Sequence, residues 1–237
     1  MTRLLLLSNS TIHGEGFLDW AEDAIRDFMG ERRRITFVPF ALDDLDAYAN
    51  TAKERLGKMG FSVRSAHEGD PRESVRDAEA VFVGGGNTFR LLKRLVETGL
   101  IEEIRRAVEG GTSYIGSSAG TNVATPTIKT TNDMPIVYPP TFDALGLVGF
   151  QINPHYVDPD PSSRHMGETR EQRIREFHEM NDAPVLGLRE GAYLRIEDGA
   201  ITLGGRKGAR LFRRGQEPAE HEPGERITAL ETGTTSA

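Results

Sequence analysis

The chain has 237 residues, a formal net charge of −7 at pH 7 and a pI near 5.5. It contains no cysteine, which excludes disulfides, thiolate metal sites and a cysteine nucleophile. The negative charge disfavours binding to a nucleic acid backbone, and the three arginines at 32–34 are too few to reverse that balance.

The four leucines at 4–7 form a run that is too short for a membrane span or for the apolar core of a signal peptide. No later apolar stretch of the sequence is long enough either. We therefore expect a cytoplasmic protein that has neither a membrane nor a nucleic acid as its partner.

The first half of the chain alternates short apolar runs with amphipathic segments. In chain order, the pattern predicts a strand at 4–7, a helix through Trp20, a strand at 35–38, a helix through Leu56 and a strand at 61–63. Two further strands are expected within 80–92 and 112–122, and each runs through glycines into a helix. Continuous apolar strands joined by helices indicate an α/β fold, with a mainly parallel sheet covered by helices on both faces.

The second half of the chain changes character after residue 124. Residues 125–140 are rich in proline and threonine, and predict an extended loop or hairpin. Asp198-Gly199 stands between two strand-like runs and predicts a two-residue antiparallel hairpin. From about residue 215 the chain is polar and is expected to fray at its end. We expect a single α/β domain over residues 1–237 with this hairpin as an antiparallel C-terminal appendage.

The first glycine-rich turn, Gly84-Gly85-Gly86 in VGGGNTF, follows an apolar strand. In open parallel sheets, chemistry gathers at the carboxyl ends of the strands, where helix N-termini offer free N–H groups. The turn lacks the Gly-x-Gly-x-x-Gly spacing and the Lys-Ser/Thr pair of a P-loop, so a nucleotide site is disfavoured. Backbone amides at Gly85 and Gly86 are instead candidate donors to a reacting oxyanion.

The second turn, GSSAG at 116–120, fits the Gly-x-Ser-x-Gly pattern, whose central residue is Ser118. In that pattern a strained turn between a strand and a helix exposes the serine above the edge of the sheet. The simpler alternative is a close-packed turn in which a serine caps the next helix. The position of the turn, after a predicted strand, favours a nucleophile.

A serine nucleophile needs a base, and the base needs an acceptor that orients it. His155 is the best candidate because it ends a predicted strand, as Ser118 does; His165 is a weaker one, and the other four histidines are expected in solvent. The acid could be Asp133 or Glu190; spacing alone does not rank them, and we place Glu190 first because it lies at the end of a predicted strand. No HExxH or similar ligand spacing is present, so no metal is expected.

Six motifs together resemble the peptidase E family, the aspartyl dipeptidases among the serine peptidases: LLLLSNST, VGGGNTF, YIGSSAGTN, TIKTTNDMPIV, QINPHY and GETREQRIREF. They occur in the same order from about residue 4 to residue 212. The resemblance implies a fold akin to the class I glutamine amidotransferases, with serine in place of their cysteine. It also implies cleavage of dipeptides with an N-terminal aspartate, without a metal or other cofactor.

The resemblance further implies roles for individual residues. Ser118 matches the nucleophile, His155 the base, and Glu190 and Asp133 the two acids assigned to the charge relay; Gly86 and Ala119 match the backbone donors to the oxyanion. One departure is Ser117, where close relatives are expected to carry a bulky aromatic residue. This departure bears on how the substrate fits the pocket and on how dry the pocket is, and leaves the chemistry intact.

The residues also point independently to an acidic substrate. Thr169 to Gln172 form a capping-box pattern that begins a helix, and Arg170 is its first helical residue. A cation there opposes the helix dipole. Arg170 could be a solvated side chain paired with Glu168 or Glu171, or it could hold a substrate carboxylate together with the free helix amides. The polar loop 157–166 before it is a candidate lid over the site.

The sequence thus predicts a serine exopeptidase for small acidic dipeptides, acting as a monomer or a homodimer. Two alternatives stay open. One is a cyanophycinase-like peptidase that cleaves β-Asp-Arg linkages, which would share the fold and the nucleophile turn. The other is a catalytically silent module that binds peptides or amino acids and keeps the turn only for packing.

Overall fold

The computed structural model describes residues 2–159 and 167–231. Its larger sheet has seven strands in the order β3-β2-β4-β5-β1-β8-β9. The five parallel strands are β1 (Arg3–Leu7), β2 (Arg34–Val38), β3 (Ser62–Ser65), β4 (Ala80–Val83) and β5 (Ser113–Ser117). Two antiparallel strands, β8 (Ala192–Glu197) and β9 (Ala200–Gly205), extend the sheet beyond β1.

Helices cover both faces of this sheet. The α-helices are α1 (Glu22–Met29), α2 (Leu45–Lys58), α3 (Pro71–Arg76), α4 (Thr88–Glu97), α5 (Leu100–Glu109), α6 (Ala119–Asn122) and α7 (Arg170–Met180). Short 3-10 turns form at Asp19–Ala21, Ile128–Thr130 and Thr228–Leu230. The segment expected as one helix through Trp20 is therefore a 3-10 turn followed by α1.

The leucine run of β1 shows why both faces must be covered. All four leucines are fully buried, and alternate side chains of a strand point to opposite faces. Leu4 and Leu6 pack into the core under α3, α4 and α5, whereas Leu5 and Leu7 pack into the core under α1 and α2. The predicted mainly parallel α/β fold with helices on both faces is confirmed.

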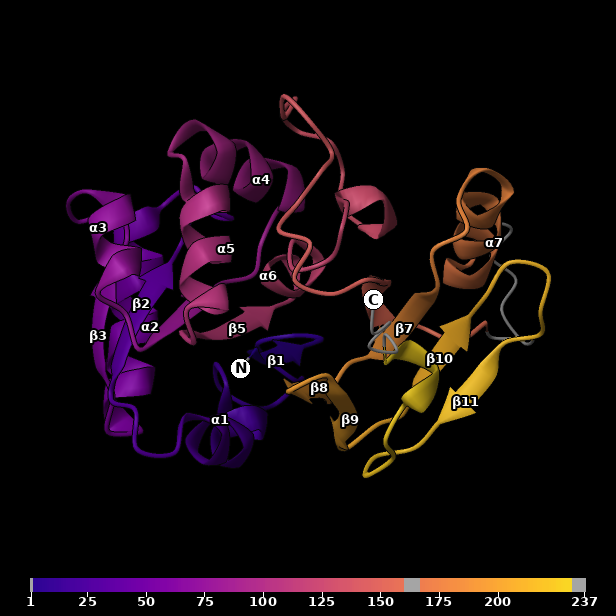
Figure 1. Cartoon of the computed structure of the whole chain (residues 1–237), viewed down its shortest axis with the longest axis horizontal. Coiled ribbons are helices and arrows are strands. Elements are labelled where there is room, and N and C mark those ends of the chain that lie inside the picture. Colours follow the sequence, from indigo (N-terminus) through magenta and orange to yellow (C-terminus); the bar gives the residue numbers. More distant parts are fainter. Residues whose placement is uncertain (1, 160–166, 232–237) are drawn as a thin grey trace, which may run out of the picture.

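A second sheet of four strands, in the order β11-β10-β7-β6, was not anticipated from the sequence. β6 (Gln151–Tyr156) and β7 (Val185–Arg189) pair in parallel, whereas β10 (Ala209–Phe212) and β11 (Ala219–His221) add to β7 in antiparallel order. Ile174 and Phe177 of α7 pack on this sheet. Figure 1 shows β7, β10, β11 and α7 at one end of the molecule, far from β2 and β3.

The predicted hairpin at Asp198-Gly199 joins β8 to β9, and both residues have a positive φ (50° and 84°), as a type I′ turn requires. The polar C-terminal stretch contributes β11 to the second sheet and two buried side chains, Ile227 and Leu230. Residues 232–237 lie outside the described part of the chain. Among the described residues, no helix combines the length and apolarity needed to cross a membrane.

Candidate active site

A cavity of about 370 Å³ lies where β5, β6 and β7 end. Its lining includes a serine, a histidine, two carboxylates and an arginine from five different segments. The lining residues are Thr88, Ser118, Ala119, Thr131, Asn132, Asp133, Pro154, His155, Val157, Arg170 and Glu190. Six of the residues singled out in the sequence, these five and Ala119, therefore meet in one place.

Ser118 occupies the strained turn that the glycine pattern predicts. It stands between β5 and α6 with φ 53° and ψ −109°, a conformation that is costly for a residue with a side chain. The turn is very tight, because a Cβ atom on Gly120 would lie 2.0 Å from the carbonyl oxygen of Val83. The Ser118 side chain makes no capping hydrogen bond to α6, so the simpler alternative of a capping serine is wrong.

His155 lies between Ser118 and Glu190. Its Nε2 is 2.9 Å from Ser118 Oγ, and its Nδ1 is 2.6 Å from Glu190 Oε1. Both ring nitrogens therefore have partners, and the tautomer with the proton on Nδ1 leaves Nε2 free to accept the serine proton. His155 also has a positive φ of 53°, at a point where the register between β6 and β7 shifts.

Asp133, the other candidate acid, is bound elsewhere. Its Oδ2 accepts a hydrogen bond from the backbone N–H of Thr88 at 2.7 Å, at the first residue of α4. A carboxylate is favoured at this helix end by the unpaired amides and by the dipole. Asp133 thus faces the same cavity as the His155 imidazole without serving as its partner.

The backbone amides of Gly86 and Ala119 are the candidate oxyanion donors. In the hydrogen bonds of the described residues, neither amide has an acceptor. Ala119 directly follows Ser118 and begins α6, where N–H groups lack partners inside the helix. The glycine turn lies against the serine, since a Cβ atom on Gly85 would be 3.6 Å from Ser118 Oγ. Gly86 itself has φ 132°, which a residue with a side chain rarely adopts.

Arg170 is the first residue of α7, and the predicted capping box between Thr169 and Gln172 is present. Its expected carboxylate partners are engaged by other arginines: Glu168 pairs with Arg173, whereas Glu171 pairs with Arg175 and Arg210. Partial burial, reinforced by the nearby Arg173 cation, lowers the pKa of the Arg170 guanidinium, and Asp133 opposes this shift. Since arginine stays protonated in proteins, a partly desolvated cation lines the cavity.

Comparison with known proteins identifies the family. A model of Peptidase family S51 matches residues 4–204. The chain belongs to peptidase family S51. This confirms the resemblance to the peptidase E family that the sequence motifs indicate.

Curated relatives agree with this membership, and a solved structure shows the same fold. The S51 chain is 55% identical to "Peptidase E" of Streptomyces coelicolor, over 98% of this chain and 99% of the relative. It is 50% identical to "Probable alpha-aspartyl dipeptidase" of Drosophila melanogaster, over 89% of each chain. The crystal structure of a peptidase from an acI-B1 Actinobacterium shares the fold, with a TM-score of 0.71 and 15% identity over 96% of each chain.

Other residues of this S51 peptidase differ from the sequence expectations or were missed. His178 was expected in solvent, but it is buried, with Nε2 3.1 Å from Ala183 O, because it lies one turn after Ile174 on the packed face of α7. His165 and residues 160–166 of the candidate lid lie outside the described residues. Thr131 and Asn132 also line the cavity, and they were not predicted as site residues. In the sequence, only their position directly before Asp133 could have indicated this role.

Ser117, where the sequence departs from the expected aromatic residue, does not face the cavity. Its side chain is fully buried, and it is not among the residues that line the site. The effect of the departure would therefore be transmitted through packing beneath Ser118 rather than by direct contact with a ligand.

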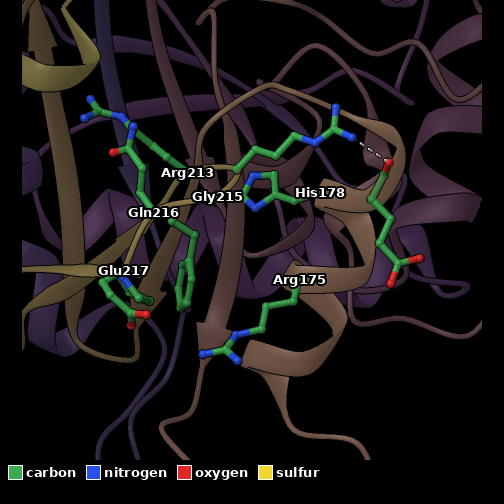
Figure 2. A pocket seen from close by; sticks show the side chains of 10 residues that line it. Arg175, His178, Arg213, Gly215, Gln216 and Glu217 are labelled. Atoms are coloured by element: carbon green, nitrogen blue, oxygen red, sulfur yellow. Dashed lines mark hydrogen bonds between the residues drawn. The ribbon is translucent and has the colours of Figure 1, made fainter.

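A second hollow of this S51 peptidase, about 340 Å³, lies between α7 and the turn that follows β10. Figure 2 shows it with Arg175, His178 and Arg213 among the lining side chains. Its cations have partners within the chain: Arg175 pairs with Glu171, and Arg213 donates to the Ala229 carbonyl. It also lacks the combination of serine, histidine and glutamate found in the first cavity, which is therefore the candidate active site.

Proposed function

We propose that this chain is a serine exopeptidase that hydrolyses dipeptides with an N-terminal aspartate. The hydrogen-bonded series from Ser118 through His155 to Glu190 supports acyl transfer, because it joins a nucleophile, a base and an orienting carboxylate in order. The observation that carries the substrate proposal is Arg170, a partly desolvated cation in the same cavity. The names of the relatives from Streptomyces coelicolor and Drosophila melanogaster support it further.

In the proposed mechanism, Ser118 Oγ attacks the peptide carbonyl carbon while His155 Nε2 accepts the hydroxyl proton. The amides of Gly86 and Ala119 stabilise the negative charge that develops on the carbonyl oxygen. The C–N bond then breaks, the proton passes from His155 to the leaving amine, and an aspartyl ester of Ser118 remains. Water, deprotonated by His155, hydrolyses this ester and restores the serine.

The two other charged groups of the cavity fit the two ends of an aspartyl residue. Arg170 would pair with the aspartate side-chain carboxylate, and bidentate pairing of this kind is both strong and directional. Asp133, held at the α4 N-terminus, would accept the substrate α-ammonium group. A substrate with a free N-terminus is thereby preferred, which is why we propose an exopeptidase rather than an endopeptidase.

Steady-state rates with Asp-Leu, Glu-Leu and Ala-Leu test this proposal when wild type is compared with Arg170→Ala. An unpaired carboxylate in a partly desolvated pocket should cost about 3 kcal/mol or more, so kcat/KM for Asp-Leu should fall about 10² to 10³-fold. The rate for Ala-Leu should barely change. Wild type should prefer Asp-Leu to Glu-Leu by about 1–3 kcal/mol, because one added methylene crowds the pocket.

Arg173→Ala is a matched control, because Arg173 lies on the same helix but pairs with Glu168 in a half-exposed bridge. It should leave the preference for aspartate intact. Equal losses on all three dipeptides in Arg170→Ala would show that Arg170 serves the fold and that specificity lies elsewhere. Faster cleavage of β-Asp-Arg than of Asp-Leu would favour the cyanophycinase-like alternative, and failure of a fluorophosphonate to label Ser118 would favour the silent binding module.

A further inference from the structure

The carboxyl end of β1 places two buried polar residues between the two sheets. Ser8 and Asn9 follow four buried leucines and are themselves 0% and 1% exposed. Polar side chains at such positions are costly unless they are hydrogen-bonded, so their contacts indicate why they are there. β1 pairs with β5 and β8 in the larger sheet, whereas the Ser8 side chain reaches β6 and β7 of the second sheet. Asn9 binds Gly191, in the turn that follows β7.

The Ser8 hydroxyl connects β6 with β7. It accepts a hydrogen bond from the backbone N–H of His155 at 2.9 Å and donates to the carbonyl oxygen of Leu188 at 2.8 Å. A hydroxyl has one proton, and here its direction is determined, since the His155 amide can only donate and the Leu188 carbonyl can only accept. One buried side chain therefore bonds to the backbone of both strands that carry the candidate base and acid.

His155 needs this acceptor because of its backbone conformation. Its φ of 53° is unfavourable for a residue with a side chain, and the ladder between β6 and β7 pairs Pro154 with Leu188 and then Tyr156 with Arg189, passing over His155. Its N–H has no place in that ladder, and a buried amide without an acceptor is costly. The Ser8 hydroxyl supplies the acceptor at the residue whose imidazole must stay 2.9 Å from Ser118 Oγ.

The same strand end holds the other two candidate catalytic residues. Asn9 Oδ1 accepts from the N–H of Gly191 at 2.9 Å, so Glu190 lies between two backbone groups tied to the end of β1. The residue before Ser8 makes the third contact: the carbonyl oxygen of Leu7 accepts a hydrogen bond from the N–H of Ser118 at 3.1 Å. Three consecutive residues thus bind the backbone at, or next to, the nucleophile, the base and the acid.

We propose that Ser8 is a positioning residue for catalysis, whose hydroxyl holds the backbone of His155 and the end of β7 in the arrangement that proton transfer requires. The inference rests on the proposed roles of Ser118, His155 and Glu190. Ser8 does not touch the substrate, so its loss should act on the chemical step rather than on binding.

The test compares kcat and KM for Asp-Leu in Ser8→Ala and in a control, Ser113→Ala. Ser113 is also fully buried on a strand of the larger sheet, and within the described chain its hydroxyl has no partner. Displacing a catalytic group by about 1 Å can cost about 10²-fold, so kcat of Ser8→Ala should fall about 10 to 10²-fold while KM changes less than about threefold. Ser113→Ala should keep the wild-type kcat.

Rates are expressed per active site titrated with a fluorophosphonate, at a temperature well below unfolding, so that loss of folded protein does not imitate the effect. Ser8→Cys gives a second variant of similar size whose thiol is a weak donor and acceptor. It should show the same reduction in kcat to a smaller degree. Wild-type kcat in folded Ser8→Cys, or a change confined to KM in Ser8→Ala, would overturn the proposal.

The rate of Ser118 labelling by the fluorophosphonate separates this inference from the substrate proposal. Labelling depends on the Ser118–His155 pair and does not require an aspartyl dipeptide. If wild type labels rapidly and Ser8→Ala labels at least about tenfold more slowly, Ser8 positions the pair even if Asp-Leu proves a poor substrate. Equal labelling rates in the two folded proteins would contradict the inference, whatever the substrate.

Discussion

Removing the Glu190 carboxylate should slow the chemical step by a moderate factor. Glu190 Oε1 lies 2.6 Å from His155 Nδ1, and a hydrogen bond of this kind strengthens when the imidazole gains a proton during the reaction. A bond to a charged group is worth about 1.5–3 kcal/mol, which corresponds to about 10- to 150-fold in rate. Glu190→Ala should therefore lower kcat for Asp-Leu within this range.

The exposure of the pair sets the upper limit of this effect. The side chains of His155 and Glu190 are 37% and 53% exposed, so water screens their charges and can hydrate Nδ1 when the carboxylate is removed. A buried triad acid can be worth about 10⁴-fold in kcat. We expect less than that here, because Glu190 stands at an open rim of the cavity.

Asp133→Ala is the matched variant, since it truncates the other carboxylate of the same cavity. Asp133 binds the Thr88 amide rather than the imidazole, so its loss should mainly raise KM through the substrate ammonium group. Release of leucine from Asp-Leu, followed over a range of substrate concentrations, separates the two constants, and thermal unfolding monitors the fold. A large fall in kcat for Asp133→Ala together with an unchanged kcat for Glu190→Ala would refute the assignment of Glu190 as the partner of His155.

Three further outcomes are expected. Ser118→Ala should lower kcat by about 10⁴ to 10⁶-fold without unfolding the chain, whereas Ser117→Ala should do far less, and equal losses on Asp-Leu would refute the choice of nucleophile. Gly120→Ala should destabilise the fold by more than about 2 kcal/mol in urea unfolding, because its Cβ would lie 2.0 Å from a backbone oxygen of β4; unchanged stability would mean that the turn can open. Hydrogen bonds from Arg189 lower the pKa of Asp158, so their stabilisation is present above about pH 4 and lost as the pH falls below it. Asp158→Asn should therefore lower the melting temperature by more at pH 7 than at pH 3, and an equal decrease at both values would count against this ion pair.

Features that depend on neighbouring residues could be predicted from the sequence alone. The turn around Ser118 requires small residues within five positions, and the capping box before α7 requires Thr169 and Gln172 three residues apart. Asp198-Gly199 likewise carries its own turn geometry. The parallel order of the first five strands follows from apolar runs separated by helical segments, since such strands need covering on both faces.

Contacts between distant segments could not be predicted in this way. The second sheet forms because β6 pairs with β7 and β7 pairs with β10. The residues of a short strand do not specify which other strand it will pair with. That pairing places Glu190 beside His155, 35 residues away, and leaves Asp133 at the α4 N-terminus. From the sequence, the only ground for placing Glu190 ahead of Asp133 was its position at the end of a predicted strand; the hydrogen bond to His155 depends on the tertiary structure.

Ser8 illustrates the same difference between local features, which the sequence predicts, and contacts between distant segments, which it does not. Local rules predict from residues 4–8 a strand of four leucines that is followed by a serine. The contacts of this hydroxyl with the amide of His155, 147 positions later, and with the carbonyl of Leu188, 180 positions later, exist only in the folded chain. Hydrogen bonds between such distant residues depend on how the two sheets pack against each other, and packing is a property of the folded chain as a whole.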